Sequence, residues 1–338
     1  MCGHLFRWPF FLAPSRALRI PAGEAGKRAW REESRMKMEQ AMPAMADLNT
    51  VCGGLGGEDY TTGNASLDDP RNQDGIGEDE LLAVSFGTSF NDSRRLTIGA
   101  IECALEHAFP GWSVRRAFTS RTIIDRIRRR DGVSIDSVEQ ALERAAENGV
   151  KRLVIQPTHL MNGLEYHDVA AAVAQFAGAF EAVSVGAPLL DSEEDFRVVA
   201  GVLAEAAARY GDKRTAVCFM GHGTEAASNA VYARMQRVMA GAGCANCFIG
   251  TVEASPGLEE VLAMVKAGDY DRVVLQPMMI VAGDHANHDM AGDGEDAWKT
   301  AFAREGYSVE CVLKGLGEYQ SIQELLVSHA RAAVDKLG

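Results

Sequence analysis

The feature that most constrains this chain is an internal repeat, in which residues 152–163 (RLVIQPTHLMNG) match residues 272–283 (RVVLQPMMIVAG). Each copy is an apolar, β-rich run that closes with Gln-Pro and then Gly, which is typical of a buried strand that delivers a loop at its carboxyl end. Directly after the repeat, Glu165 and His285 stand at equivalent positions. A carboxylate and an imidazole on two similar halves can hold a metal ion or move protons, so we expect function where the copies differ.

Strands and helices alternate from Glu78 onward. Apolar runs predict strands at 81–87, 112–119, 152–160, 182–190, 215–223, 247–252, 272–280 and 308–315. Helices are expected between them, among them one over 92–107 and one over 134–148 that opens with a Ser cap. This order predicts an α/β protein with two doubly wound, flavodoxin-like halves, parallel sheets, and an active-site cleft between the halves.

The first part of the chain has a different composition. Gly, Asn, Asp and Ser dominate the stretch before Glu78, and such a segment cannot bury enough apolar surface to become ordered. We therefore expect residues 1–78 to be a disordered leader or a mis-assigned start, and Arg7 and the prolines argue against an export signal. Residues 79–212 and 213–338 are expected to form the N-terminal and C-terminal halves.

Charge and cysteine content narrow the class of protein. A formal net charge of -13 argues against nucleic-acid binding. The sequence contains no run of eighteen apolar residues, so no membrane span is predicted. Cys244 and Cys247 form a CxxC, but it precedes a strand and lacks a second pair, so we assign it no metal or redox role. Scattered thiols favour a reducing cytoplasm, and apolar helices are compatible with a homo-oligomer.

Several polar residues follow predicted strands, at the edge where ligands bind in such sheets. Ser85, Gly87 and Thr88 belong to the turn after the first strand of the N-terminal half. His222, Glu253 and His285 follow three strands of the C-terminal half. This convergence is the strongest chemical signal in the sequence, because three strand ends of one sheet bring metal-binding side chains together.

The residues carry a resemblance over about 80–335. The runs VSFGTSFNDSRRLTIGAIE, RAFTSRTII, FMGHGT, VEASP and PMMIVAGDHANHDMAGDGEDAWK resemble the anaerobic sirohydrochlorin cobaltochelatases, class II chelatases related in fold to ferrochelatase. The resemblance implies insertion of Co²⁺ into sirohydrochlorin with release of two protons, in cobalamin biosynthesis. It also implies that His222 is metal ligand and proton acceptor and that Glu253 and His285 complete the metal site. Co²⁺ is then a substrate, and no permanently bound cofactor is expected.

The implied site is chemically coherent. Two imidazoles and a carboxylate suit Co²⁺ and leave coordination positions open for pyrrole nitrogens. A ligand nitrogen cannot also accept a proton, so either His222 leaves the metal during transfer or another group such as Glu165 relays protons. His288 is a further candidate ligand, at a position where the family commonly has Asn.

The macrocycle is a polycarboxylate, so we expect local contacts that offset the acidic charge of the protein. The candidates for substrate binding are the turn and strand-end residues Ser85, Phe86, Gly87, Thr88 and His159. The basic candidates for the carboxylates are Arg94, Arg95, Arg115, Arg116 and Arg121. Two alternatives stay open: a chelatase that inserts Fe²⁺ or Ni²⁺ into the same or a similar ring, and a carrier that binds haem or another tetrapyrrole without catalysis.

Overall fold

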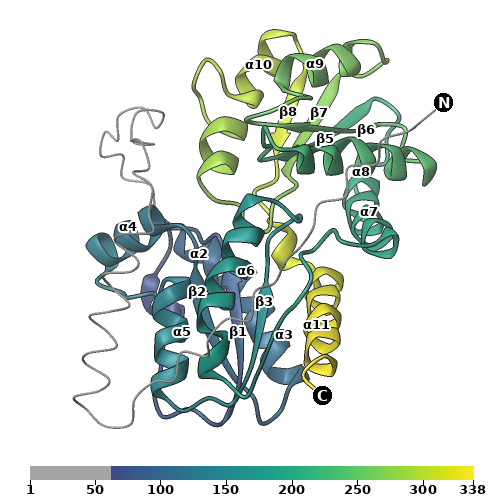
Figure 1. Cartoon of the computed structure of the whole chain (residues 1–338). Helices are drawn as coiled ribbons and strands as arrows, with labels where there is room; N and C mark the ends of the chain where they lie inside the picture. Colours follow the sequence, from purple (N-terminus) through teal and green to yellow (C-terminus); the bar gives the residue numbers. More distant parts are fainter. Residues whose placement is uncertain (1–61) are drawn as a thin grey trace, which may run out of the picture. The chain divides into compact units, whose positions relative to one another are not determined.

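The computed structural model describes residues 62–338, which contain two four-stranded parallel sheets. The first has the order β2-β1-β3-β4 and the second the order β6-β5-β7-β8 (Figure 1). The strands of the first sheet are β1 (Asp79–Ser85), β2 (Ser113–Phe118), β3 (Arg152–Pro157) and β4 (Ala182–Val185). Those of the second are β5 (Thr215–Gly221), β6 (Cys247–Thr251), β7 (Arg272–Pro277) and β8 (Ser308–Cys311). The predicted α/β fold with two similar, doubly wound halves is confirmed.

The sequence repeat is also a structural repeat. β3 and β7 occupy the same place in their sheets, each between the central strand and an edge strand. Both strands end at the proline of the repeat, which is earlier than the sequence analysis predicted. Because proline has no N–H to donate, it suits the last position of a strand, and the chain then leaves the sheet as a loop.

Helices cover both faces of each sheet, and two of them cross between the halves. Besides short 3₁₀ and π turns, the helices are α2 (Asn91–Arg94), α3 (Ala100–Ala108), α4 (Arg121–Asp131), α5 (Val138–Glu147), α6 (Leu164–Phe176), α7 (Glu193–Ala208), α8 (Ala230–Gly241), α9 (Leu258–Lys266), α10 (Trp298–Arg304) and α11 (Gln320–Asp335). α11 packs on α3 and β3 of the first half, whereas α7 packs on α8 of the second (Figure 1). One hydrophobic core therefore contains residues from both halves. Within residues 62–338, no helix is both long and apolar enough to cross a membrane.

Local signals explain where the helices differ from the prediction. The helix expected from Ser134 begins at Val138, because Ser137 accepts a hydrogen bond from the backbone of Gln140 and the Gln140 side chain closes a capping box. α4 was not predicted from the sequence, because its many arginines hide a short apolar stripe. Its signals are the Ser120 cap at one end and Gly132, with φ +70°, at the other.

Part of the expected disordered leader packs on the first half. Asp68 lies 2.6 Å from Nε of Arg94 and 2.7 Å from Nη1 of Arg116, and Arg116 also pairs with Glu102 at 2.7 Å. Although burial opposes ionisation, the two guanidinium groups hold the pKa of Asp68 below its usual value. Residues 62–78 therefore belong to the fold, and their polar composition conceals this because they contribute ion pairs rather than apolar area. Residues 1–61 lie outside the described part of the chain.

Burial removes three arginines from the list of substrate contacts. The side chains of Arg94, Arg115 and Arg116 are fully buried, and Arg115 pairs with Glu80 at 2.7 Å. Their expected contact with substrate carboxylates is therefore wrong, because their charges serve buried carboxylates of the protein itself. Arg121 is exposed and Arg95 is partly exposed, and for them the expectation stays a prediction.

We expect Asp68→Asn to lower the free energy of unfolding by about 3 kcal/mol, because it leaves two buried guanidinium groups short of a counter-charge. Asp74→Asn is the matched control from the same segment, since the Asp74 side chain is 68% exposed where it pairs with Arg144. Urea unfolding of both variants measures the difference. Equally small losses would show that residues 62–78 contribute little to stability.

Candidate metal centre

His222 is the first residue after β5, and its ring is held by the backbone around it. Nδ1 lies 2.9 Å from the carbonyl oxygen of Gly223, which can only accept, so Nδ1 carries the proton and Nε2 presents its lone pair outward. Tyr232 supports this turn: its buried hydroxyl accepts a hydrogen bond from Gly223 N–H at 3.2 Å. Gly221 must be glycine, because a Cβ there would lie 2.1 Å from the Tyr232 ring.

Glu253 is brought beside His222 by hydrogen bonds between two neighbouring loops. β5 and β6 run parallel, and just beyond their ends the N–H of Glu253 donates to the carbonyl oxygen of His222 at 2.9 Å. The Glu253 carboxylate consequently lies 3.6 Å from Nδ1 of His222. Both side chains stay accessible, with exposed fractions of 54% for Glu253 and 42% for His222.

His285 comes from the loop after β7, where the repeat ends. Its Nδ1 lies 2.7 Å from Oδ2 of Asp289, one helical turn further along, so the carboxylate accepts from Nδ1 and leaves Nε2 for another partner. Chiefly through this hydrogen bond, Asp289 raises the pKa of His285. Asp289 was not predicted from the sequence, although its spacing of four residues from His285 is typical of side chains that meet on a helical turn.

The three predicted metal ligands do meet in the structure. Each of His222, Glu253 and His285 offers one ligand atom, and these atoms all lie within 4.8 Å of one another. The two imidazole rings meet edge to face, with their centroids 4.7 Å apart. Two nitrogen donors and one oxygen donor at this spacing suit a divalent first-row transition metal.

Two other candidates lie outside this cluster. His288 turns its Nδ1 toward Asp284, at 3.2 Å, and its ring toward Phe90, so it does not join the cluster that the structure forms. Glu165 is exposed in the first turn of α6. Burial raises the pKa of Tyr232, and the negative charge of Glu165 raises it further.

The predicted substrate-binding turn lies between the halves. Gly283 of the second half approaches Thr88 so closely that a Cβ would lie 3.0 Å from its Oγ1, and Ala282 N–H donates to Ser93 Oγ at 3.0 Å. Among Ser85, Phe86, Gly87, Thr88 and His159, Phe86 has the exposed side chain, at 47%. Ser85 is buried and accepts a hydrogen bond from Thr158 at 2.8 Å. Substrate contact by these five residues stays a prediction.

His159 is buried at the end of β3, and neither of its ring nitrogens has a hydrogen-bond partner. Because a charged imidazole is costly without water or a counter-ion, burial lowers the pKa of His159 to about 4. The residue is therefore neutral near pH 7, and its small exposed area limits contact with a ligand.

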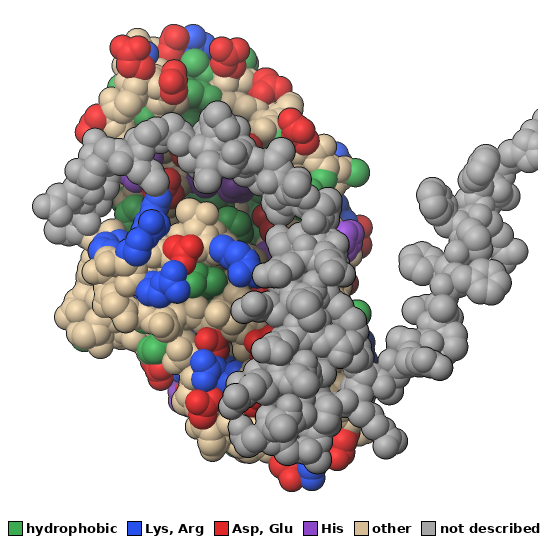
Figure 2. Space-filling model, turned by 60° about the vertical axis from the view of Figure 1, so that its left-hand side comes forward, with side chains coloured by type: hydrophobic (Ala, Val, Ile, Leu, Met, Phe, Trp, Pro, Cys, Tyr) green, Lys and Arg blue, Asp and Glu red, His purple; other side chains and the backbone are tan. Residues whose placement is uncertain are grey.

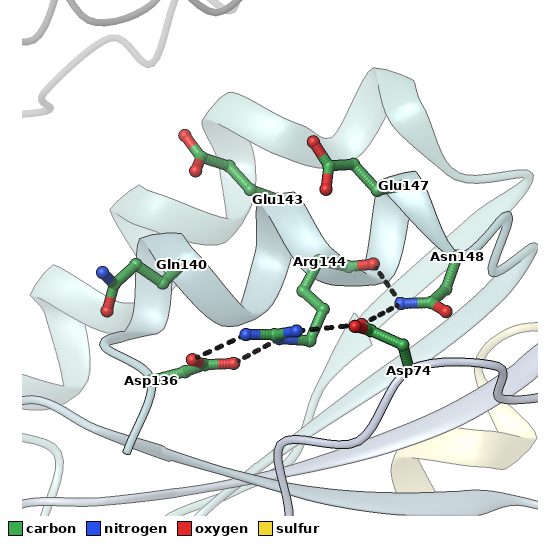
Figure 3. A pocket seen from close by; sticks show the side chains of 7 residues that line it. All are labelled: Asp74, Asp136, Gln140, Glu143, Arg144, Glu147 and Asn148. Atoms are coloured by element: carbon green, nitrogen blue, oxygen red, sulfur yellow. Dashed lines mark hydrogen bonds and ion pairs between the residues drawn. The ribbon is translucent and has the colours of Figure 1, made fainter. Parts of the chain in front are cut away.

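Two further features lie away from the cluster. Cys244 and Cys247, which the sequence analysis left without a redox role, are joined by a disulfide. A pocket on α5 is built around Arg144, which pairs with Asp136 at 2.7 Å and Asp74 at 2.9 Å, while Asn148 also donates to Asp74 (Figure 3). Its lining contains none of the candidate site residues.

We expect His159 to make the protein less stable in mild acid. With a folded-state pKa of about 4 against an ordinary value near 6.5, stability is complete above pH 6.5 and falls as the pH drops toward 4. Between pH 7 and pH 5 the loss from this residue is about 2 kcal/mol. His159→Gln, which does not titrate, should remove that part of the pH dependence in urea unfolding. An unchanged pH dependence would contradict the assignment.

Comparison with known proteins gives the family of the chain. Residues 79–335 match the family model described as cobalt chelatase (CbiK). A sirohydrochlorin cobaltochelatase of Salmonella typhimurium is 36% identical over 260 residues, which covers 75% of this chain and 96% of the relative. Sirohydrochlorin cobaltochelatase CbiKC of Nitratidesulfovibrio vulgaris is 34% identical over 265 residues, covering 76% and 91%. The solved structure of Bacillus subtilis SirB with Fe³⁺ shares the fold, with a TM-score of 0.56 at 12% identity over 77% of this chain and 97% of that one. The chain belongs to the cobalt chelatase (CbiK) family.

Proposed function

We propose that this protein inserts Co²⁺ into sirohydrochlorin. The observation that carries the proposal is the cluster of His222, Glu253 and His285, found in a member of the cobalt chelatase family. The two relatives described above are named sirohydrochlorin cobaltochelatases, which supports the choice of ring and metal. We further propose that the protein acts in the cytoplasm as a homo-oligomer. It needs no permanently bound cofactor.

We infer that both imidazoles bind the metal through Nε2. Each imidazole uses Nδ1 for a protein acceptor, Gly223 O for His222 and Asp289 for His285, so both Nε2 atoms are available to Co²⁺. Glu253 adds a carboxylate oxygen. Three protein donors leave coordination positions for the pyrrole nitrogens, so bonds to the ring can form before all bonds to the protein break.

Insertion must also remove two protons, because two pyrrole N–H bonds are replaced by bonds to the metal. While Nε2 of His222 binds the metal, it cannot accept a proton, and Nδ1 already carries one. A second base is therefore needed. We assign Glu165 as the proton relay: it is exposed, it comes from the first half, and its charge acts on Tyr232, which contacts the turn that carries His222.

Replacing His222 tests the centre of this proposal. In an anaerobic absorbance assay with sirohydrochlorin and Co²⁺, we expect the intact protein to accelerate metallation above the spontaneous rate. His222→Ala should lose about 100-fold of this acceleration or more, because the substitution removes a metal ligand, which costs at least as much as removing an outer-shell partner. His107→Ala, which changes an exposed histidine on α3, is the control. Tight ring binding without acceleration by the intact protein would indicate a carrier instead.

Asp289 should act on metal affinity. Asp289→Asn weakens the hydrogen bond that orients His285, so we expect Co²⁺ to bind about 10-fold to 100-fold more weakly. Asp293→Asn is the matched control, since Asp293 is 97% exposed and pairs with Lys299 in the same loop region. Titration with Co²⁺, followed through the visible absorption of the bound ion, gives both affinities. Equal affinities for the two variants would remove Asp289 from the site.

A further inference from the structure

α4 is a basic helix placed between the substrate-binding turn and the metal-ligand loop. Near its start, Ser120 N–H donates to the carbonyl oxygen of Phe86 at 3.3 Å, and near its end Arg130 donates to the carbonyl oxygen of Ser89 at 2.6 Å. Its apolar stripe packs with Val281 of the loop after β7. The helix therefore contacts the loops of both halves that surround the candidate site.

Arg126 extends from α4 toward the metal-ligand loop. Its Nη1 lies 3.7 Å from Oδ1 of Asp284, which immediately precedes His285. The Arg126 side chain is 31% exposed and that of Asp284 is 59% exposed. An ion pair this long and this accessible is weak, because water and salt screen it, so the guanidinium can exchange Asp284 for another carboxylate.

The surroundings of Arg126 match a flat ring with acidic substituents. The face that carries α4 shows Lys and Arg side chains gathered close to histidine side chains (Figure 2). Phe86, beside the start of α4, adds an exposed aromatic ring that can pack on a macrocycle. Arginine is well suited to the rim of such a ring, because its planar fork binds a carboxylate through two parallel hydrogen bonds.

We propose that Arg126 binds a carboxylate on the rim of the tetrapyrrole. In the free protein, Asp284 keeps the guanidinium extended toward the site. When substrate arrives, its carboxylate replaces Asp284 as the partner. This inference rests on the proposed function, because it assumes that the ring lies at the metal cluster.

The test compares Arg126→Gln with Arg128→Gln. Arg128 lies two residues along the same helix, is 63% exposed, and pairs with Asp125 of α4 itself, so it controls for loss of one positive charge. With sirohydrochlorin and Co²⁺ under anaerobic conditions, we expect Arg126→Gln to raise KM about 10-fold or more, as loss of a charge-assisted hydrogen bond does. Its kcat should stay within about twofold of the intact value, and Arg128→Gln should leave both parameters there. Arg126→Lys should recover part of the loss, because it restores the charge without the fork.

The outcomes separate the two proposals. If the intact protein accelerates metallation and Arg126→Gln has the KM of the control, the inference is overturned while the proposed function stands. A fall in kcat at constant KM, or weaker Co²⁺ binding by Arg126→Gln, also overturns it. If the intact protein does not accelerate metallation, the proposed function fails. A titration of sirohydrochlorin without metal then decides the inference, since weaker binding by Arg126→Gln alone supports it and equal binding overturns it.

Discussion

The parallel pairing of β5 with both β6 and β7 is the constraint on which the metal centre depends. Parallel neighbours place their carboxyl ends at one edge of the sheet, so the residues that follow them leave the sheet side by side. The hydrogen bond from Glu253 N–H to His222 O continues this pairing beyond the strands. Backbone hydrogen bonding thus places His222 and Glu253 side by side, and the loop after β7 adds His285.

The two copies of the repeat have diverged in what their loops carry. After β7, the position equivalent to Glu165 holds His285, which is anchored by Asp289 and joins the cluster. After β3, Glu165 stays exposed and outside the cluster. In the first half, charged side chains instead form a buried network of ion pairs around Asp68 and Arg116. This network attaches residues 62–78 to the sheet. The loop after β7 therefore contributes a side chain to the donor cluster, while the loop after β3 leaves its carboxylate exposed.

The fold and the proximity of the three candidate ligands could be predicted because they depend on local patterns. Strand ends follow from apolar runs, and residues such as His222 follow strand ends directly. Asp68 and Arg94 could not be read in this way, since their pairing joins residues 26 positions apart in a segment whose composition is typical of disorder. α4 could not be predicted for a related reason, because its arginines hide the apolar stripe around Ile127. The role proposed for Arg126 depends on its ion pair with Asp284 of the other half, which the sequence does not reveal.

The accessibility of the cluster would suit a site that must release metal as well as bind it. A closed site with a fourth protein ligand would hold Co²⁺ more tightly and would have to break more bonds during transfer. Here His288 is turned to Asp284, and His222 and Glu253 keep about half of their side-chain surface exposed. Fixing each Nδ1 with an acceptor defines the direction of Nε2 without adding a donor to the metal. The protein therefore orients the two imidazoles, and the macrocycle would supply the remaining bonds to the metal.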